Sequence, residues 1–144
     1  MLKVVFDSTV LISAFLAKTG VSADLLHKAK DGAFVICLAE EILYEVQRAL
    51  LQYQKIRKRY HYPDQTVIQF VQSLRVVTRI ITNLPSVEVV DSDPNDNMVV
   101  ACAIEARAGY IITRDNDLLS LEKYGDIKIV TPEGFMGMLR KDGL

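Results

Sequence analysis

The segment KVVFDSTVLIS, residues 3–13, decides the fold and raises the question of function. It begins as an apolar run, places Asp7 and two hydroxyl residues in its middle, and then continues with three more apolar residues. A carboxylate flanked in this way is not an ordinary solvated surface charge, because charged residues are rare inside apolar surroundings. Since the run before Asp7 is rich in β-branched residues, we predict a buried strand over 2–6 with Asp7 at its carboxyl end.

The composition is that of a globular protein. Of the 144 residues, 50% are hydrophobic and 24% are charged, and a chain of this length can bury roughly 70% of its unfolded surface in one domain. Cys37 and Cys102 lie far apart in apolar runs, which favours buried thiols over a disulfide or a metal site. The chain shows neither a signal-peptide pattern nor an apolar run near the ~18 residues of a membrane helix. We therefore expect one domain over 1–144 in a soluble, cytoplasmic protein that does not engage a membrane.

Short apolar runs alternate with longer segments of helical periodicity. Strands are predicted over 2–6, 33–38, 87–90, 110–113 and 127–130. Helices are predicted over 22–31, 40–52, 64–82, 95–108, 116–122 and 132–140. This alternation predicts an α/β sandwich with a mostly parallel sheet between helices, in which ligands bind beyond the carboxyl ends of the strands.

Acidic residues follow two of the predicted strands. Asp7 ends the first strand, and Asp115 follows YIIT in the segment YIITRDNDLL, so both carboxylates should reach the same edge of the sheet. Asp96 can join them, because its spacing to Val100 places it at the amino end of the buried stripe of the helix after Asp93. Asp96 can also simply complement the helix dipole, and capping alone suffices to explain Asp93.

Glu45 lies in the amphipathic segment AEEILYEVQRAL, residues 39–50, beside its apolar stripe. By position alone, a solvated side chain paired with Arg48 three residues later explains it.

Four segments together resemble the PIN-domain family, and more narrowly the PIN proteins that act as toxins of prokaryotic toxin–antitoxin pairs. They are VVFDSTVLISAFL, EILYEVQRAL, DSDPNDNMVVACAIEARAGYIITRDNDLLSL and IVTPEGFM, in this order along nearly the whole chain. The resemblance implies a five-stranded parallel sheet of order 3-2-1-4-5 flanked by helices. It also implies a ribonuclease that depends on Mg²⁺ or Mn²⁺.

The family's acidic residues match four positions of this chain. The resemblance implies that Asp7, Glu45, Asp96 and Asp115 are catalytic and hold the metal. Only this match, and not its position in the helix, makes Glu45 a candidate site residue. Thr9 stands where many relatives have Asn two residues after the first acid, and a hydroxyl there can still hold a water or a phosphate oxygen.

Two further residues lie close to these acids in the sequence. Thr113 stands where relatives often keep Ser or Thr, and can brace the site. Asp117 either assists a second metal ion or serves the start of the next helix.

Converging carboxylates repel one another, and at neutral pH some take up protons unless a cation compensates. Hard divalent ions prefer oxygen ligands, and one or two such ions can activate water against a phosphodiester. Neither a Ser–His–Asp nor a Cys–His arrangement competes with this reading.

The segment YQKIRKRYHYP, residues 53–63, concentrates cations and tyrosines. Cations for the backbone and rings for the bases are the components of a single-strand binding surface, which makes Lys55, Arg57, Lys58 and Arg59 candidate RNA-binding residues. A solvated loop with no such role explains the segment equally well. The net charge of −1 gives no general attraction to nucleic acid, so any binding must rest on a local patch.

We therefore predict a metal-dependent endoribonuclease with an RNA substrate. The resemblance further implies a small antitoxin partner and a homodimer. An aspartate-based phosphatase is the first alternative, since VVFDSTV begins like the haloacid dehalogenase motif, although Thr9 replaces that motif's second Asp. The second alternative is a non-catalytic module, either receiver-like or RNA-binding, whose acids only bind Mg²⁺. Formation of a covalent aspartyl-phosphate would identify a phosphatase or a receiver-like module rather than a nuclease.

Overall fold

The computed structural model describes residues 1–88 and 93–143. The strands are β1 (Lys3–Phe6), β2 (Val35–Ala39), β3 (Arg79–Ile81), β4 (Tyr110–Ile112), β5 (Lys123–Tyr124) and β6 (Ile127–Val130). The helices are α1 (Ser8–Leu16), α2 (Val21–Lys30), α3 (Glu40–Gln52), α4 (Gln54–Arg59), α5 (Asp64–Val77), α6 (Pro94–Ala106), α7 (Asn116–Leu119) and α8 (Pro132–Lys141).

The strands form one sheet in the order β3-β2-β1-β4-β6-β5. β1 lies at the centre, where Val5 is opposite Cys37 of β2 on one side and opposite Ile111 of β4 on the other. Every pairing is parallel except that of the short edge strand β5 with β6. The predicted parallel α/β fold is confirmed: β6 takes the fifth place of the order 3-2-1-4-5, and β5 adds a sixth, antiparallel strand.

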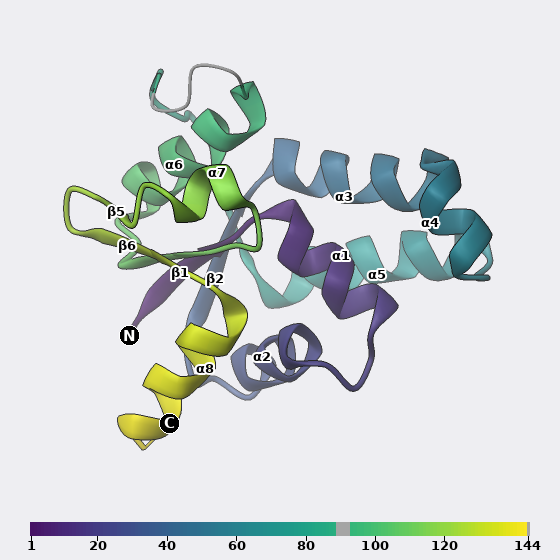
Figure 1. Ribbon diagram of the computed structural model, residues 1–144, viewed down its shortest axis with the longest axis horizontal. Helices are drawn as coiled ribbons and strands as arrows, with labels where there is room; N and C mark the ends of the chain where they lie inside the picture. The colour runs from purple at the N-terminus through teal and green to yellow at the C-terminus, as the bar shows by residue number, and fades with distance from the viewer. Residues whose placement is uncertain (89–92, 144) are drawn as a thin grey trace.

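Helices cover the sheet on both sides (Figure 1). α6 packs across β1, β2 and β4, whereas α1 contacts both α2 and α3, and α3 in turn contacts α5. The buried side chains of β1 and β2 are almost all apolar and fully covered, as expected for parallel strands enclosed on both faces. This enclosure leaves the ends of the strands as the accessible part of the sheet.

Two of the predicted boundaries are wrong. The helix predicted over 64–82 ends at Val77, and the chain then forms β3, in which Ile80 is opposite Leu38 of β2. The run VVTRII is rich in β-branched residues. Their side chains lose less rotamer freedom in a strand than in a helix, which favours the strand. The strand predicted over 87–90 falls partly outside the described residues, and residues 87 and 88 belong to no strand.

Three elements, α1, α4 and β5, were not predicted from the sequence. α1 is apolar along almost its whole length, so it lacks the polar face that identifies an amphipathic helix. The segment considered as a loop after α3 contains α4, which starts directly after Tyr53. Among the described residues no single helix is long and apolar enough to cross a membrane, and α1 and α2 meet that test only as a pair bent by 100°.

Candidate functional site

Asp7 is buried at the junction of β1 and α1, with 4% of its surface exposed. It is the N-cap of α1: its Oδ1 accepts a hydrogen bond from the backbone N–H of Val10 at 3.3 Å and another from the Thr9 hydroxyl at 2.5 Å. Its Oδ2 accepts a hydrogen bond from the Thr113 hydroxyl, which lies at the end of the neighbouring strand β4. The expectation that this carboxylate is not a solvated charge is therefore correct.

The same two hydroxyls connect the ends of β1 and β4. Thr9 Oγ1 accepts from the backbone N–H of Arg114 at 3.2 Å, and Thr113 Oγ1 accepts from the backbone N–H of Asp115 at 2.9 Å. Thr113 is fully buried. Each hydroxyl thus donates to Asp7 while it accepts from the segment that carries Asp115, so the positions of the two acids depend on each other.

Three carboxylates converge beside Asp7. Oxygen atoms of Asp93, Asp96 and Asp115 all lie within 4.8 Å of one another. Asp93 is the N-cap of α6 and accepts from the Asn95 backbone N–H at 2.9 Å. Asp96 lies in the first turn of that helix, is 5% exposed, and has an Oδ2 atom with no hydrogen-bond partner among the described residues. An unpaired buried oxygen is costly, so this atom is the clearest indication of a missing partner.

These acids line one hollow of about 250 Å³ at the carboxyl ends of the strands. Its walls include all four acids that the sequence analysis singled out, namely Asp7, Glu45, Asp96 and Asp115, together with Asp93. Strand ends, the start of α6 and the middle of α3 supply these residues. The sheet-edge rule for parallel α/β folds thus locates the hollow correctly.

Burial raises the pKa of two of these carboxyl groups, Asp7 and Asp96, in the metal-free protein. Burial, followed by the hydrogen bond and the negative charge of Asp115, raises the pKa of Asp96 to about 8. Burial also raises the pKa of Asp7, although its hydrogen bonds from Thr113, Thr9 and Val10 oppose that rise. A cation placed among the acids would favour their charged forms and so oppose both pKa shifts.

We predict that the metal-free protein loses stability as the pH rises from about 4 to about 8. In this window the folded state keeps a proton on Asp96 that the unfolded state, with a pKa of 3.8, has released. For each proton that only the folded state binds, the free energy of unfolding falls by up to about 1.4 kcal/mol for each unit by which the pH rises. Urea unfolding in EDTA at pH 5 and pH 8 measures this difference.

The matched control for that measurement is Asp96→Asn, which has no proton to lose and should show a smaller dependence on pH. Equal slopes for the two proteins would show that Asp96 is not the group responsible.

Glu45 lines the hollow but is already paired. Arg48 Nη2 donates to its Oε2 at 2.9 Å, and the Tyr53 hydroxyl donates to its Oε1 at 3.0 Å. Arg48 also donates to the Tyr53 hydroxyl at 2.8 Å, which closes a three-membered network. Glu45 is absent from the group of acids within 4.8 Å of one another. The ion pair with Arg48 that position alone suggested is present.

The remaining candidate residues lie farther from the acids. Asp117 is exposed on α7 and does not line the hollow; its backbone N–H donates to Asp115 at 3.2 Å. Lys55, Lys58 and Arg59 are exposed on α4. Arg57 differs from them, because it forms an ion pair with Asp64 at 2.6 Å and donates to the carbonyl oxygens of Leu51 and Tyr62.

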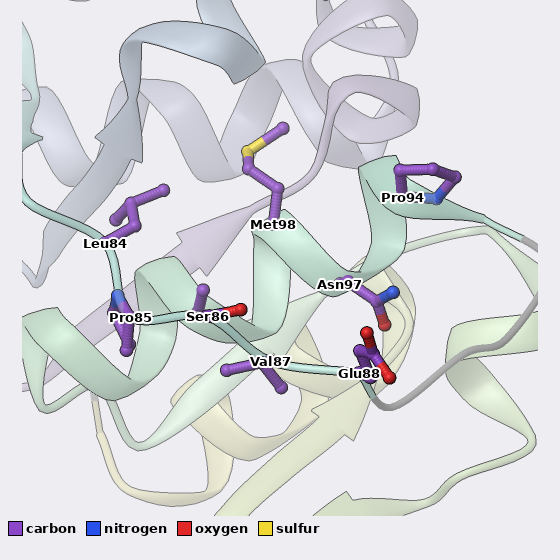
Figure 2. A pocket seen from close by; sticks show the side chains of 9 residues that line it. Leu84, Pro85, Ser86, Val87, Glu88, Pro94, Asn97 and Met98 are labelled. Atoms are coloured by element: carbon purple, nitrogen blue, oxygen red, sulfur yellow. The ribbon is translucent and has the colours of Figure 1, made fainter.

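A second hollow, of about 560 Å³, lies between residues 84–88 and the first half of α6 (Figure 2). Figure 2 shows Leu84 to Glu88 running along the helix, where Asn97 and Met98 complete the wall. Of the described residues that line it, only Glu88 is charged. This hollow therefore lacks the converging ionisable groups that distinguish the first.

A comparison with models of known protein families finds the PIN domain over residues 3–117. The chain belongs to the PIN-domain family. PIN proteins typically are nucleases, and the resemblance noted in the sequence is confirmed.

Three known proteins are similar to this chain in sequence or in fold. The uncharacterized protein MJ1680 of Methanocaldococcus jannaschii is 30% identical over 148 residues, which cover 97% of this chain and 93% of that protein. PAE2754 from Pyrobaculum aerophilum superposes with a TM-score of 0.65 at 15% identity, over 97% of this chain and 90% of the other. A chain of VapBC2 from Rickettsia felis, in a crystal structure bound to a DNA fragment from the VapBC2 promoter, superposes with a TM-score of 0.61 at 12% identity. The match covers 89% of this chain and 97% of the other. At these identities the two structures support the PIN fold alone.

Sequence reasoning placed four acids at this PIN site and assigned the fifth, Asp93, to capping alone. Asp93 does cap α6, but it also approaches Asp96 and Asp115. The only signal in the sequence is the spacing of three residues between Asp93 and Asp96, which places both on the first turn of one helix.

Proposed function

We propose that this PIN protein is a metal-dependent endoribonuclease that hydrolyses phosphodiester bonds of RNA. The observation that carries the proposal is the buried carboxylate of Asp96, which lies among other carboxylates and whose Oδ2 has no hydrogen-bond partner among the described residues. Acids gathered in this way need a cation to be stable in their charged form. Membership of a family of nucleases and a hollow at the carboxyl ends of the strands agree with this function.

The donor atoms fit Mg²⁺ or Mn²⁺. They are carboxylate oxygens, with neither a thiol nor an imidazole among the residues that line the hollow, and hard divalent ions prefer such a set. We propose that Asp7, Glu45, Asp96 and Asp115 carry catalysis and that carboxylates of this hollow hold the ion, with Asp117 available to a second ion. When bound, the cation supplies Lewis-acid chemistry that lowers the pKa of water and neutralises charge on the phosphate.

The residues around the acids orient them. Thr9 and Thr113 donate to the two oxygens of Asp7 and thereby fix the plane of that carboxylate. Because both hydroxyls also accept from the chain segment that leads to Asp115, the distance between Asp7 and Asp115 is set before any substrate arrives. Such preorganisation saves the cost of arranging the groups during the reaction.

The residue two positions after Asp7 favours a nuclease over the aspartate-based phosphatase. The phosphatase motif needs a second Asp there, whereas this chain has Thr9, whose hydroxyl donates a hydrogen bond to Asp7.

A cleavage assay tests the proposed function. Purified protein should cut an end-labelled single-stranded RNA into internal fragments with Mg²⁺ or Mn²⁺ and should stop in EDTA. Single-stranded DNA of the same sequence shows whether the substrate is restricted to RNA. Cleavage that survives thorough chelation would contradict metal dependence. Efficient cleavage of DNA but not of RNA would contradict RNA as the substrate.

We predict that α4 contributes to RNA binding through Lys55, Lys58 and Arg59. Arg57 is left out because its guanidinium is already bound to Asp64 and to two carbonyl oxygens. Replacing the three exposed cations with Ala should weaken RNA binding and reduce its salt slope by up to about 2, since each contact with a single-strand phosphate contributes about 0.7. Fluorescence anisotropy at several salt concentrations measures the slope.

The matched control removes three exposed cations elsewhere, on β5 and α8: Lys123, Arg140 and Lys141. It changes the net charge equally but should leave the slope near that of the wild type. If both triple variants change the slope alike, the effect is one of net charge, and α4 has no special role.

We also propose that the protein is the toxin of a toxin–antitoxin pair and that a small antitoxin protein inhibits it. In this proposal the chain forms a single domain over 1–144, is cytoplasmic, and assembles as a homodimer. The fold shared with a chain of VapBC2 supports this role. Expression should arrest growth, and co-expression of a small protein encoded next to it should relieve the arrest. Normal growth on expression of active enzyme would contradict the toxin role without affecting the nuclease assignment.

A further inference from the structure

The acids of the hollow fall into two groups with different surroundings. Asp93, Asp96 and Asp115 have oxygen atoms within 4.8 Å of one another. Mg²⁺ binds carboxylate oxygens at about 2.0–2.1 Å, so two oxygens on opposite sides of one ion are about 4.2 Å apart. Small side-chain movements therefore suffice to bring all three carboxylates onto a single cation. Glu45 lines the same hollow but lies outside this group.

Asp96 independently indicates a ligand between these three residues. It is 5% exposed, and its Oδ2 has no hydrogen-bond partner among residues 1–88 and 93–143. Buried polar atoms in folded proteins are nearly always paired. The position next to this oxygen is therefore one where a cation would supply the missing interaction.

Glu45 has less need of a cation. Its two oxygens accept hydrogen bonds from Arg48 and Tyr53, and the guanidinium of Arg48 already compensates its charge. To reach a metal ion, Glu45 would have to give up at least one of these bonds, and Arg48 and Tyr53 would have to find new partners.

Asp93 can serve as a ligand without losing its structural role. Its Oδ1 caps α6 through the Asn95 N–H, and a carboxylate oxygen has a second lone pair, as does the other oxygen of the same group. The position at the helix N-terminus is favourable for a carboxylate, because the helix dipole stabilises its charged form.

From this geometry we infer that Asp93 is a direct ligand of the divalent cation, together with Asp96 and Asp115, and that Glu45 is not. Glu45 instead holds Arg48 and Tyr53 in a hydrogen-bonded network on α3 and the residue after it. This inference rests on the proposed function for the presence of a metal, and it replaces Glu45 by Asp93 in the ligand set that family resemblance implies.

Mn²⁺ binding tests the inference without relying on activity. The electron paramagnetic resonance signal of free Mn²⁺ falls as the ion binds, which gives a dissociation constant for the wild type, Asp93→Asn and Glu45→Gln. Asp93→Asn should weaken binding about tenfold or more, which is at least the effect known for the outer partners of metal sites. Glu45→Gln should change it by less than about threefold, because Gln still accepts from Arg48.

The two substitutions are matched in that each replaces a carboxylate by its amide. Asn caps helices as well as Asp does, so Asp93→Asn should keep α6 intact, and Asp93→Ser provides a second variant that retains the cap. A loss of affinity in Glu45→Gln equal to or larger than that in Asp93→Asn overturns the inference. Failure of the wild type to bind Mn²⁺ overturns both the inference and the metal-dependent function, whereas normal binding by Asp93→Asn overturns the inference alone.

Discussion

Asp96→Asn should reduce RNA cleavage by more than about 100-fold, because even the outer partners of metal sites cost 10- to 100-fold on removal. The same change should raise the melting temperature of the metal-free protein at pH 8. Burial, followed by the hydrogen bond and the negative charge of Asp115, raises the pKa of Asp96 to about 8, so its charged form is unfavourable in the metal-free protein. An amide removes the repulsion and can donate a hydrogen bond to Asp115. A gain of 1 kcal/mol corresponds to roughly 3 °C in a domain of this size.

Opposite changes in activity and stability distinguish a functional acid from a structural one. The control is Asp24→Asn, which makes the same replacement on the exposed surface of α2 and should change neither property. Cleavage rates under single-turnover conditions and thermal melts in EDTA provide the two measurements. Loss of activity together with a lower melting temperature would show that Asp96 mainly supports the fold.

Asp7→Asn should also reduce cleavage by more than about 100-fold, but its effect on stability has two opposing parts. Removing a buried charge is favourable, since burial already raises the pKa of Asp7. The amide nitrogen, however, cannot accept from the Thr113 hydroxyl, and an unmade buried hydrogen bond costs about 1–3 kcal/mol. We expect the two parts to cancel to within about 1 kcal/mol in the metal-free protein.

Thr113→Val separates these two parts. Alone, it removes the donor to Asp7 and the acceptor for the Asp115 backbone N–H, so it should lower stability by about 1–3 kcal/mol. Combined with Asp7→Asn, the two losses should not add, because both affect the same hydrogen bond. Strict additivity, or retained cleavage in a strongly destabilised Asp7→Asn protein, would identify Asp7 as a structural cap of α1.

The position of the site could be predicted from the sequence because it depends on simple rules. Apolar runs that end in Asp7 and Asp115 place both acids at the carboxyl edge of a parallel sheet, and the periodicity of α6 brings Asp96 to the same edge. These relations involve only strand direction and helical spacing. They do not depend on the conformation of the loops.

Other features depend on contacts that no local pattern contains. β3 was missed because VVTRII directly follows a helical pattern, and its pairing with β2 adds to the β-branched composition in selecting the strand. Arg57 looked like its neighbours in the basic segment, yet its partner Asp64 lies seven residues away across a turn. Capping explained Asp93 from the sequence, and its second role depends on the distance to Asp115, which lies after β4 at the start of α7.

The most direct test of the metal-dependent nuclease compares occupancy with rate on one preparation. Protein freed of metal by EDTA and dialysis is titrated with Mn²⁺, while Mn²⁺ binding and the single-turnover rate of RNA cleavage are followed in parallel. The account predicts no cleavage without metal and a rate that rises with the fraction of protein that holds Mn²⁺. A rate that is already maximal in the metal-free protein, or that does not follow occupancy, would contradict it.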